Sequence, residues 1–159
     1  MKILLLYGSP RKNGNTALLA DQFTRGAMEN GHEVTKYYLH EKEIKPCLAC
    51  DYCQDHKGVC IQKDDYQEAH ELMQKSDMLV IAAPVYYLGM PGDIKIFIDR
   101  SYAESAIGRH IKKAALLTAA CKEDPEITKV MTDYFEKLTD YLGWENPYRT
   151  IFFRKKNVK

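Results

Sequence analysis

Short apolar runs alternate with segments of helical periodicity along this chain. The runs at residues 3–7, 78–83 and 114–120 are almost continuously apolar and end at small residues or proline. Such runs are typical of strands that are buried on both faces of a parallel sheet. The run at 34–39 mixes β-branched and aromatic residues with a lysine, which predicts an edge strand, and 150–153 predicts a last strand.

Three segments have apolar residues at helical spacing together with signals for the ends of helices. These predicted helices span residues 16–30, 66–73 and 125–142. Asp64 and Asp65, each with an amide or an acid three places on, predict a capping box at the start of the second helix. Asp124 and Pro125 predict an N-cap and a first-turn proline for the third.

The order of these elements predicts an α/β fold. Alternating strands and helices form a doubly wound parallel sheet with right-handed crossovers and helices on both faces. Residues 94–98 fit a strand or a helix equally well, so the pattern leaves that segment open. Ligands of such sheets bind at the carboxyl ends of the strands. We therefore expect the functional residues just after positions 7, 39, 83 and 120.

Composition narrows the class of protein. The 159 residues, 45% hydrophobic and 28% charged, predict one domain over residues 1–159 and exclude a disordered chain. A net charge of +1 gives no general attraction to nucleic acid. Every uncharged run is too short, or too often broken by proline and glycine, to cross a membrane. With no signal-peptide core at the N-terminus, we expect a cytoplasmic protein.

The loop after the first strand has the residues of a phosphate site. Residues 8–16 combine two glycines with hydroxyl, amide and cationic side chains at the start of a predicted helix. The candidate ligands are Ser9, Arg11, Asn13, Asn15 and Thr16. Gly14 is not followed by lysine and the G-x-G-x-x-G spacing is absent, which disfavours ATP and dinucleotides. The alternative is an ordinary turn with solvated cations.

The loop after the third strand could frame a flat ring. Pro84, Val85, Tyr86 and Tyr87 follow a buried strand and are near glycines that allow close approach of the backbone. The alternative is that these tyrosines belong to the core.

Taken together, the two loops resemble the flavodoxin-like NAD(P)H-dependent FMN reductase family. The resemblance continues through residues 91–100 and extends to about residue 145. It implies a five-stranded sheet in the order 2-1-3-4-5 and a helix over 94–100. It also implies that the first loop holds the FMN phosphate, that the second lies along the isoalloxazine ring, and that Ala120 faces the pyrimidine edge. NAD(P)H is the implied electron donor.

Members of this family usually end with a further helix. Here only residues 154–159 follow the last predicted strand, and they are too few and too charged to cover a sheet face. We therefore expect the final helix to be lacking and the bare face to be buried in a homodimer or a higher homo-oligomer.

A cysteine-rich segment follows the second predicted strand. Cys47, Cys50 and Cys53 are separated by two residues each, and Cys60 follows. Three thiolates at this spacing, closed by a fourth, suit a [4Fe-4S] cluster better than zinc. Because the segment follows a strand, we expect it at the end of the sheet where the flavin should lie. With the flavin loops, the segment resembles the iron-sulfur flavoprotein branch, which implies these four cysteines as ligands. The alternative is a set of reduced thiols.

The sequence therefore predicts an FMN-dependent oxidoreductase that passes electrons to a small molecule or a redox protein. The flavin would carry the chemistry, and no side chain is expected to act as an acid or a base. Two alternatives stay open: a non-enzymatic flavin or iron-sulfur electron carrier or sensor, and a zinc or thiol module without flavin.

Overall fold

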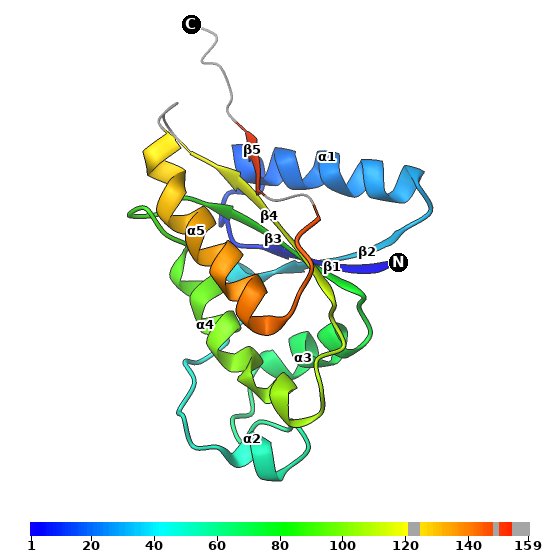
Figure 1. Cartoon of the computed structure of the whole chain (residues 1–159), viewed down its shortest axis with the longest axis vertical. Helices are drawn as coiled ribbons and strands as arrows, with labels where there is room; N and C mark the ends of the chain where they lie inside the picture. Colours follow the sequence, from blue (N-terminus) through cyan, green and yellow to red (C-terminus); the bar gives the residue numbers. More distant parts are fainter. Residues whose placement is uncertain (121–124, 148–149, 154–159) are drawn as a thin grey trace, which may run out of the picture.

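The computed structural model describes residues 1–120, 125–147 and 150–153 (Figure 1). The strands are β1 (Lys2–Tyr7), β2 (Glu33–Tyr38), β3 (Met78–Pro84), β4 (Lys113–Ala119) and β5 (Thr150–Phe153). The α-helices are α1 (Asn15–Glu29), α2 (Tyr52–Asp55), α3 (Tyr66–Gln74), α4 (Gly92–Arg100) and α5 (Pro125–Leu142). Two short 3₁₀ helices, η1 (Leu39–Glu41) and η2 (Ser101–Ala106), follow β2 and α4.

The strands form one parallel sheet in the order β2-β1-β3-β4-β5. In this register, Leu6 of β1 lies opposite Tyr37 of β2 and Ile81 of β3. The α/β class is confirmed, and the strand order is the one that the family resemblance implied. The lysine-containing strand β2 lies at an edge, as predicted.

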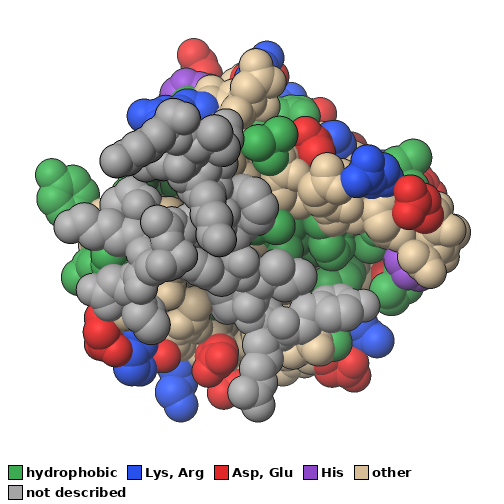
Figure 2. Space-filling model, turned by 90° about the horizontal axis from the view of Figure 1, so that it is seen from above, with side chains coloured by type: hydrophobic (Ala, Val, Ile, Leu, Met, Phe, Trp, Pro, Cys, Tyr) green, Lys and Arg blue, Asp and Glu red, His purple; other side chains and the backbone are tan. Residues whose placement is uncertain are grey.

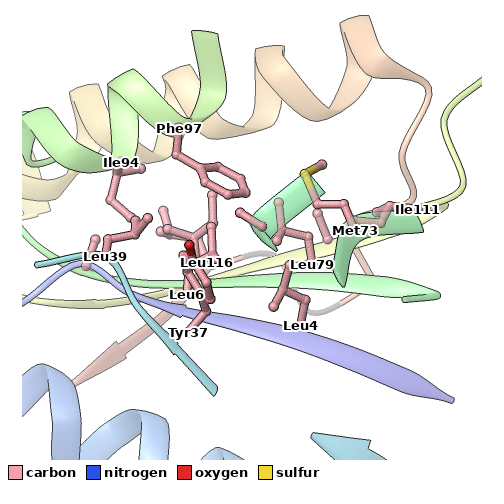
Figure 3. Packing of buried hydrophobic residues seen from close by; sticks show 14 of the residues in the cluster. Leu4, Leu6, Tyr37, Leu39, Met73, Leu79, Ile94, Phe97, Ile111 and Leu116 are labelled. Carbon is pink, nitrogen blue, oxygen red and sulfur yellow. The ribbon is translucent and has the colours of Figure 1, made fainter. Parts of the chain in front are cut away.

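Both faces of the central strands are covered, which explains why these strands are apolar throughout. Alternate residues such as Leu4 and Leu6 pack toward α3, α4 and α5, while Ile3 and Leu5 pack toward α1. Figure 3 shows Ile94 and Phe97 of α4 pointing from the helix onto the sheet. In Figure 1, α1 lies on the opposite side of the sheet from α4 and α5.

Packing decides the conformation of the ambiguous segment 94–98. It forms the middle of α4, with Pro91 at the N-cap. Ile94 and Phe97, three residues apart on one side of the helix, are both fully buried. The helix implied by the resemblance is confirmed.

The predicted capping box before α3 is wrong. The N-cap residue of this helix is Asp65, and its side chain makes no capping hydrogen bond. The Asp64 carboxylate accepts the N–H of Tyr66, the first residue of the helix, at 3.2 Å, but the reciprocal bonds of a capping box are not formed. The Asp65 carboxylate instead accepts the N–H of Glu43 at 2.8 Å, and the Asp64 carboxylate accepts that of Lys45 at 2.9 Å. Because these aspartates accept hydrogen bonds from the backbone of a distant segment, they fasten residues 43–45 to the start of α3.

Two other expectations concern residues outside the described part of the chain. Helix α5 begins at Pro125 as predicted, but its expected N-cap, Asp124, lies outside the described residues. The prediction that the final helix is lacking rests on residues 154–159, which also lie outside the described part of the chain.

Among the described helices, none combines the length and the apolar character that a membrane span requires.

Candidate functional site: a two-loop cavity and a cysteine pocket

The first loop starts at a close contact between β1 and α4. The N–H of Gly8 donates to the carbonyl of Ala82 on β3 at 2.8 Å. A Cβ at position 8 would lie 2.7 Å from Cγ1 of the buried Ile94. Glycine is therefore needed here so that the chain can leave the sheet directly beneath α4.

The loop ends at an uncapped helix N-terminus. No side chain of the described residues caps α1, and its first turn contains no acid. The N–H groups of a first helical turn have no partner within the helix, and they lie at the positive end of its dipole. Thr16 is buried in this turn, and Ser9 Oγ accepts the N–H of Arg11 at 3.3 Å. The arrangement suits an anion.

Lys12, the second cation of the phosphate loop, pairs with an acidic side chain of η1. Lys12 Nζ lies 2.5 Å from Oε1 of Glu41 in η1. The hydrogen bond to Glu41 raises the pKa of Lys12 above its usual value. This leaves Arg11 as the cation of the loop that lines the cavity described next.

The first and second loops line one open cavity of about 220 Å³, although Thr16 and Pro84 are 68 positions apart in the sequence. Of the predicted site residues, it brings together Ser9, Arg11, Asn15, Thr16, Pro84, Val85, Tyr86 and Ala120. Gly14 and Ala119 also line it, and neither was among the predicted site residues. Asn13 and Tyr87 are not among the lining residues.

Tyr87 lies instead at the tip of a strained turn. Tyr86 and Gly89 exchange two backbone hydrogen bonds of 2.9 Å. Between them, Tyr87 and Leu88 both have positive φ, 48° and 66°, a conformation that glycine and asparagine adopt more readily. The side chain of Tyr87 is fully exposed. The turn therefore projects a tyrosine and a leucine into solvent beside the cavity.

The cysteine segment forms a second, smaller pocket. All four predicted ligands, Cys47, Cys50, Cys53 and Cys60, line one cavity of about 20 Å³, and all four are free thiols. Cys53 also packs against the core. Within the described ranges, no three His, Cys, Asp or Glu side chains are arranged to hold a single metal ion. A cubane cluster spreads its four ligands around a larger body than one ion does.

The cysteine pocket does not lie where we expected it. Its lining includes Arg100, the last residue of α4, and Tyr102 and Ala103 of η2, whereas the two-loop cavity is lined in part by residues that precede the N-terminal end of α4. No residue lines both cavities. The expectation that the cysteines lie at the flavin end of the sheet is wrong, because residues 43–65 are held along α4 and η2.

Comparison with known proteins identifies the family of this chain. The sequence profile of the NADPH-dependent FMN reductase family matches residues 1–143. The chain belongs to this family.

Relatives and solved structures agree with this assignment. Two iron-sulfur flavoproteins from Archaeoglobus fulgidus are 40% and 42% identical over 100 and 101 residues, or 63% and 64% of this chain. The aligned part is 45% and 49% of those proteins, so the chain spans about half the length of the curated relatives it matches. The structure of RosB with bound 8-demethyl-8-formylriboflavin-5'-phosphate matches with a TM-score of 0.79 at 18% identity, covering 100% of this chain and 67% of RosB. That likeness shows the fold.

Two buried contacts of this FMN reductase family member were not predicted, one an ion pair and the other between a histidine and a carboxylate. Arg100 and Asp64 are bridged at 2.7 Å, and Nη2 of Arg100 donates to Cys60 Sγ at 3.3 Å. His70 Nδ1 lies 2.6 Å from Glu104 Oε1, also in the interior. The partners are more than 30 residues apart, so no spacing signal links them. A charged residue that falls on the apolar face of α4, as Arg100 does, is the one hint in the sequence.

Proposed function

We propose that this protein is an FMN-dependent oxidoreductase that takes electrons from NAD(P)H and passes them to a small-molecule acceptor or a redox protein. One observation carries the proposal: loops from two different strands line a single cavity at an uncapped helix N-terminus. The family assignment supports it. FMN, when bound, supplies the redox chemistry, because a flavin takes up one or two electrons.

In this proposal the residues of the chain have only binding roles. The N–H groups of the first turn of α1, together with Ser9, Arg11, Asn15 and Thr16, hold the phosphate. Pro84, Val85 and Tyr86 frame the ring on one side, and Ala120 lies near its edge. Asn13 and Tyr87, which do not line the cavity, stay in the proposal only as rim residues.

The test compares FMN with riboflavin, which lacks the phosphate, by quenching of flavin fluorescence. Arg11→Gln should weaken FMN binding about ten- to a hundredfold, because one hydrogen bond to a charged group contributes roughly 1.5–3 kcal/mol. It should leave riboflavin binding unchanged. Arg25→Gln, an exposed change further along α1, is the control and should change neither affinity. Equal weakening of both flavins by Arg11→Gln, or no saturable quenching in the wild type, would refute the phosphate site.

Turnover separates the enzyme from a carrier. Steady-state oxidation of NAD(P)H with a quinone or ferricyanide as acceptor is expected for the reductase. A protein that binds FMN and does not turn over would be the alternative electron carrier or sensor.

We also propose that Cys47, Cys50, Cys53 and Cys60 hold a [4Fe-4S] cluster. Four free thiols around one cavity and the names of the relatives support this. Unpaired thiols also fit the reducing cytoplasm that we propose as the location. Iron and acid-labile sulfide should each reach about four per chain in anaerobically prepared protein. Zinc, or neither metal nor sulfide, would refute the cluster and leave the flavin proposal standing.

A second copy of the chain is the proposed partner on the α1 side. A cavity of about 490 Å³ there is lined by apolar residues, among them Met1 and Phe23, and by the polar residues Gln22, Asn30 and His32. Figure 2 shows hydrophobic side chains gathered on this side of the molecule, in the half of the view where α1 lies. Met1 of this lining is exposed, and exposed apolar surface tends to become an interface. A monomeric mass by light scattering at micromolar concentration would refute the proposal.

A further inference from the structure

One arginine joins both ends of the cysteine segment. The buried guanidinium of Arg100 donates from Nη1 to Asp64 Oδ2 at 2.7 Å and to the carbonyl of Lys45 at 2.8 Å. From Nη2 it donates to Asp64 Oδ1 at 3.0 Å and to Cys60 Sγ at 3.3 Å. The segment that contains the four cysteines therefore begins and ends on the same side chain.

The position of Arg100 is set by rigid structure. It lies three residues after Phe97 and six after Ile94, on the side of α4 that packs against the sheet. Its guanidinium also lies 4.6 Å from the centroid of the Tyr66 ring, at the start of α3. Helices α4 and α3 thus fix the position of the guanidinium, and the cysteine segment supplies the acceptor, the sulfur of Cys60.

We propose that Arg100 is a positioning residue of the cysteine site, which holds Cys60 in the cavity and donates a hydrogen bond to its sulfur. The inference rests on the proposed cluster. The bidentate pair with Asp64 is neutral as a whole, but its N–H groups face Cys60. Hydrogen bonds to ligand sulfurs, together with net charge, set the potential of iron-sulfur clusters. A donor at this sulfur favours the more negative, reduced state and so raises the reduction potential.

A purely structural role would be limited to closing the loop. A structural role predicts that removing the Arg100–Asp64 pair lowers the stability of the protein. The reduction potential of the cluster would then not change in the molecules that still fold. The two roles are separated by measuring iron content and midpoint potential together with an independent check of the fold.

The main variant replaces both partners, Arg100→Gln with Asp64→Asn, so that no unpaired charge stays buried. Lys95→Gln is the control, because Lys95 is on the exposed side of the same helix and pairs with Asp99. Each protein is reconstituted anaerobically with ferrous iron and sulfide. Iron per chain, midpoint potential by redox titration and FMN quenching are then measured, the last as the readout of folding.

We expect at least a twofold loss of iron in the double variant, a lower midpoint potential in the fraction that is loaded, and unchanged FMN affinity. Lys95→Gln should match the wild type in all three. If the double variant does not bind FMN, Arg100→Lys takes its place. Lysine keeps the positive charge but cannot form the bidentate hydrogen bonds of a guanidinium, so this variant should also lower the midpoint potential.

Full iron content with an unchanged potential would overturn the role of Arg100 and leave the cluster standing. A wild type that takes up no iron or sulfide would overturn both the cluster and this inference, while FMN binding would still test the flavin site separately.

Discussion

Gly8 is the position where the structure makes the sharpest prediction about stability. In Gly8→Ala the new methyl carbon would lie 2.7 Å from Cγ1 and 2.8 Å from Cδ1 of Ile94, and 3.4 Å from the carbonyl oxygen of Ala82. Ile94 is fully buried on α4 and cannot move into solvent. Overpacking of a core by one methyl group costs about 1–3 kcal/mol. We expect a loss of about 2 kcal/mol in the free energy of unfolding.

Urea denaturation followed by circular dichroism measures this loss as a lower midpoint with an unchanged slope. Gly26→Ala is the control: a Cβ there meets nothing within 4 Å, and alanine should stabilise α1 by about 0.5–1 kcal/mol. Combining Gly8→Ala with Ile94→Ala should cost less than the sum of the two single changes, because the second removes the colliding atoms. A Gly8→Ala midpoint equal to that of the wild type would refute the close contact between β1 and α4.

Two further predictions concern strain and charge. Leu88→Gly should raise the free energy of unfolding by about 0.5–1 kcal/mol, because it removes the penalty of a leucine at positive φ from the exposed turn; an unchanged or lower urea midpoint would argue against that strain. Burial acts to raise the pKa of Asp64, but the hydrogen bonds from Arg100 and from backbone N–H groups outweigh it and hold this pKa below its usual value. Since the pKa is lower in the folded than in the unfolded chain, the stabilisation by Asp64 is complete above about pH 4 and is lost as the pH falls through the folded value. Between pH 7 and pH 2 the wild type should therefore lose more stability than Asp64→Asn, and equal losses would contradict the pair.

Much of the fold follows from local pattern. The apolar runs of β1, β3 and β4 are buried on both faces, as their composition predicts. Helix α1 begins and ends within one residue of the predicted bounds, because its periodicity and the glycine that follows it are both local signals. The predicted phosphate loop also lies at an uncapped helix N-terminus, because a glycine-rich turn between a buried strand and a helix places it there.

Contacts between distant segments were decided only in the tertiary structure. Residues 94–98 have no pattern of their own and become helical because Ile94 and Phe97 pack on the sheet. Asp64 carries a capping signal and does accept the first N–H of α3, but its carboxylate also pairs with Arg100, 36 residues away, because a buried guanidinium needs a carboxylate partner. The same pairing carries the cysteines to the far end of α4. Sequence spacing determines which thiols can act together, and the packing of α4 determines where they lie.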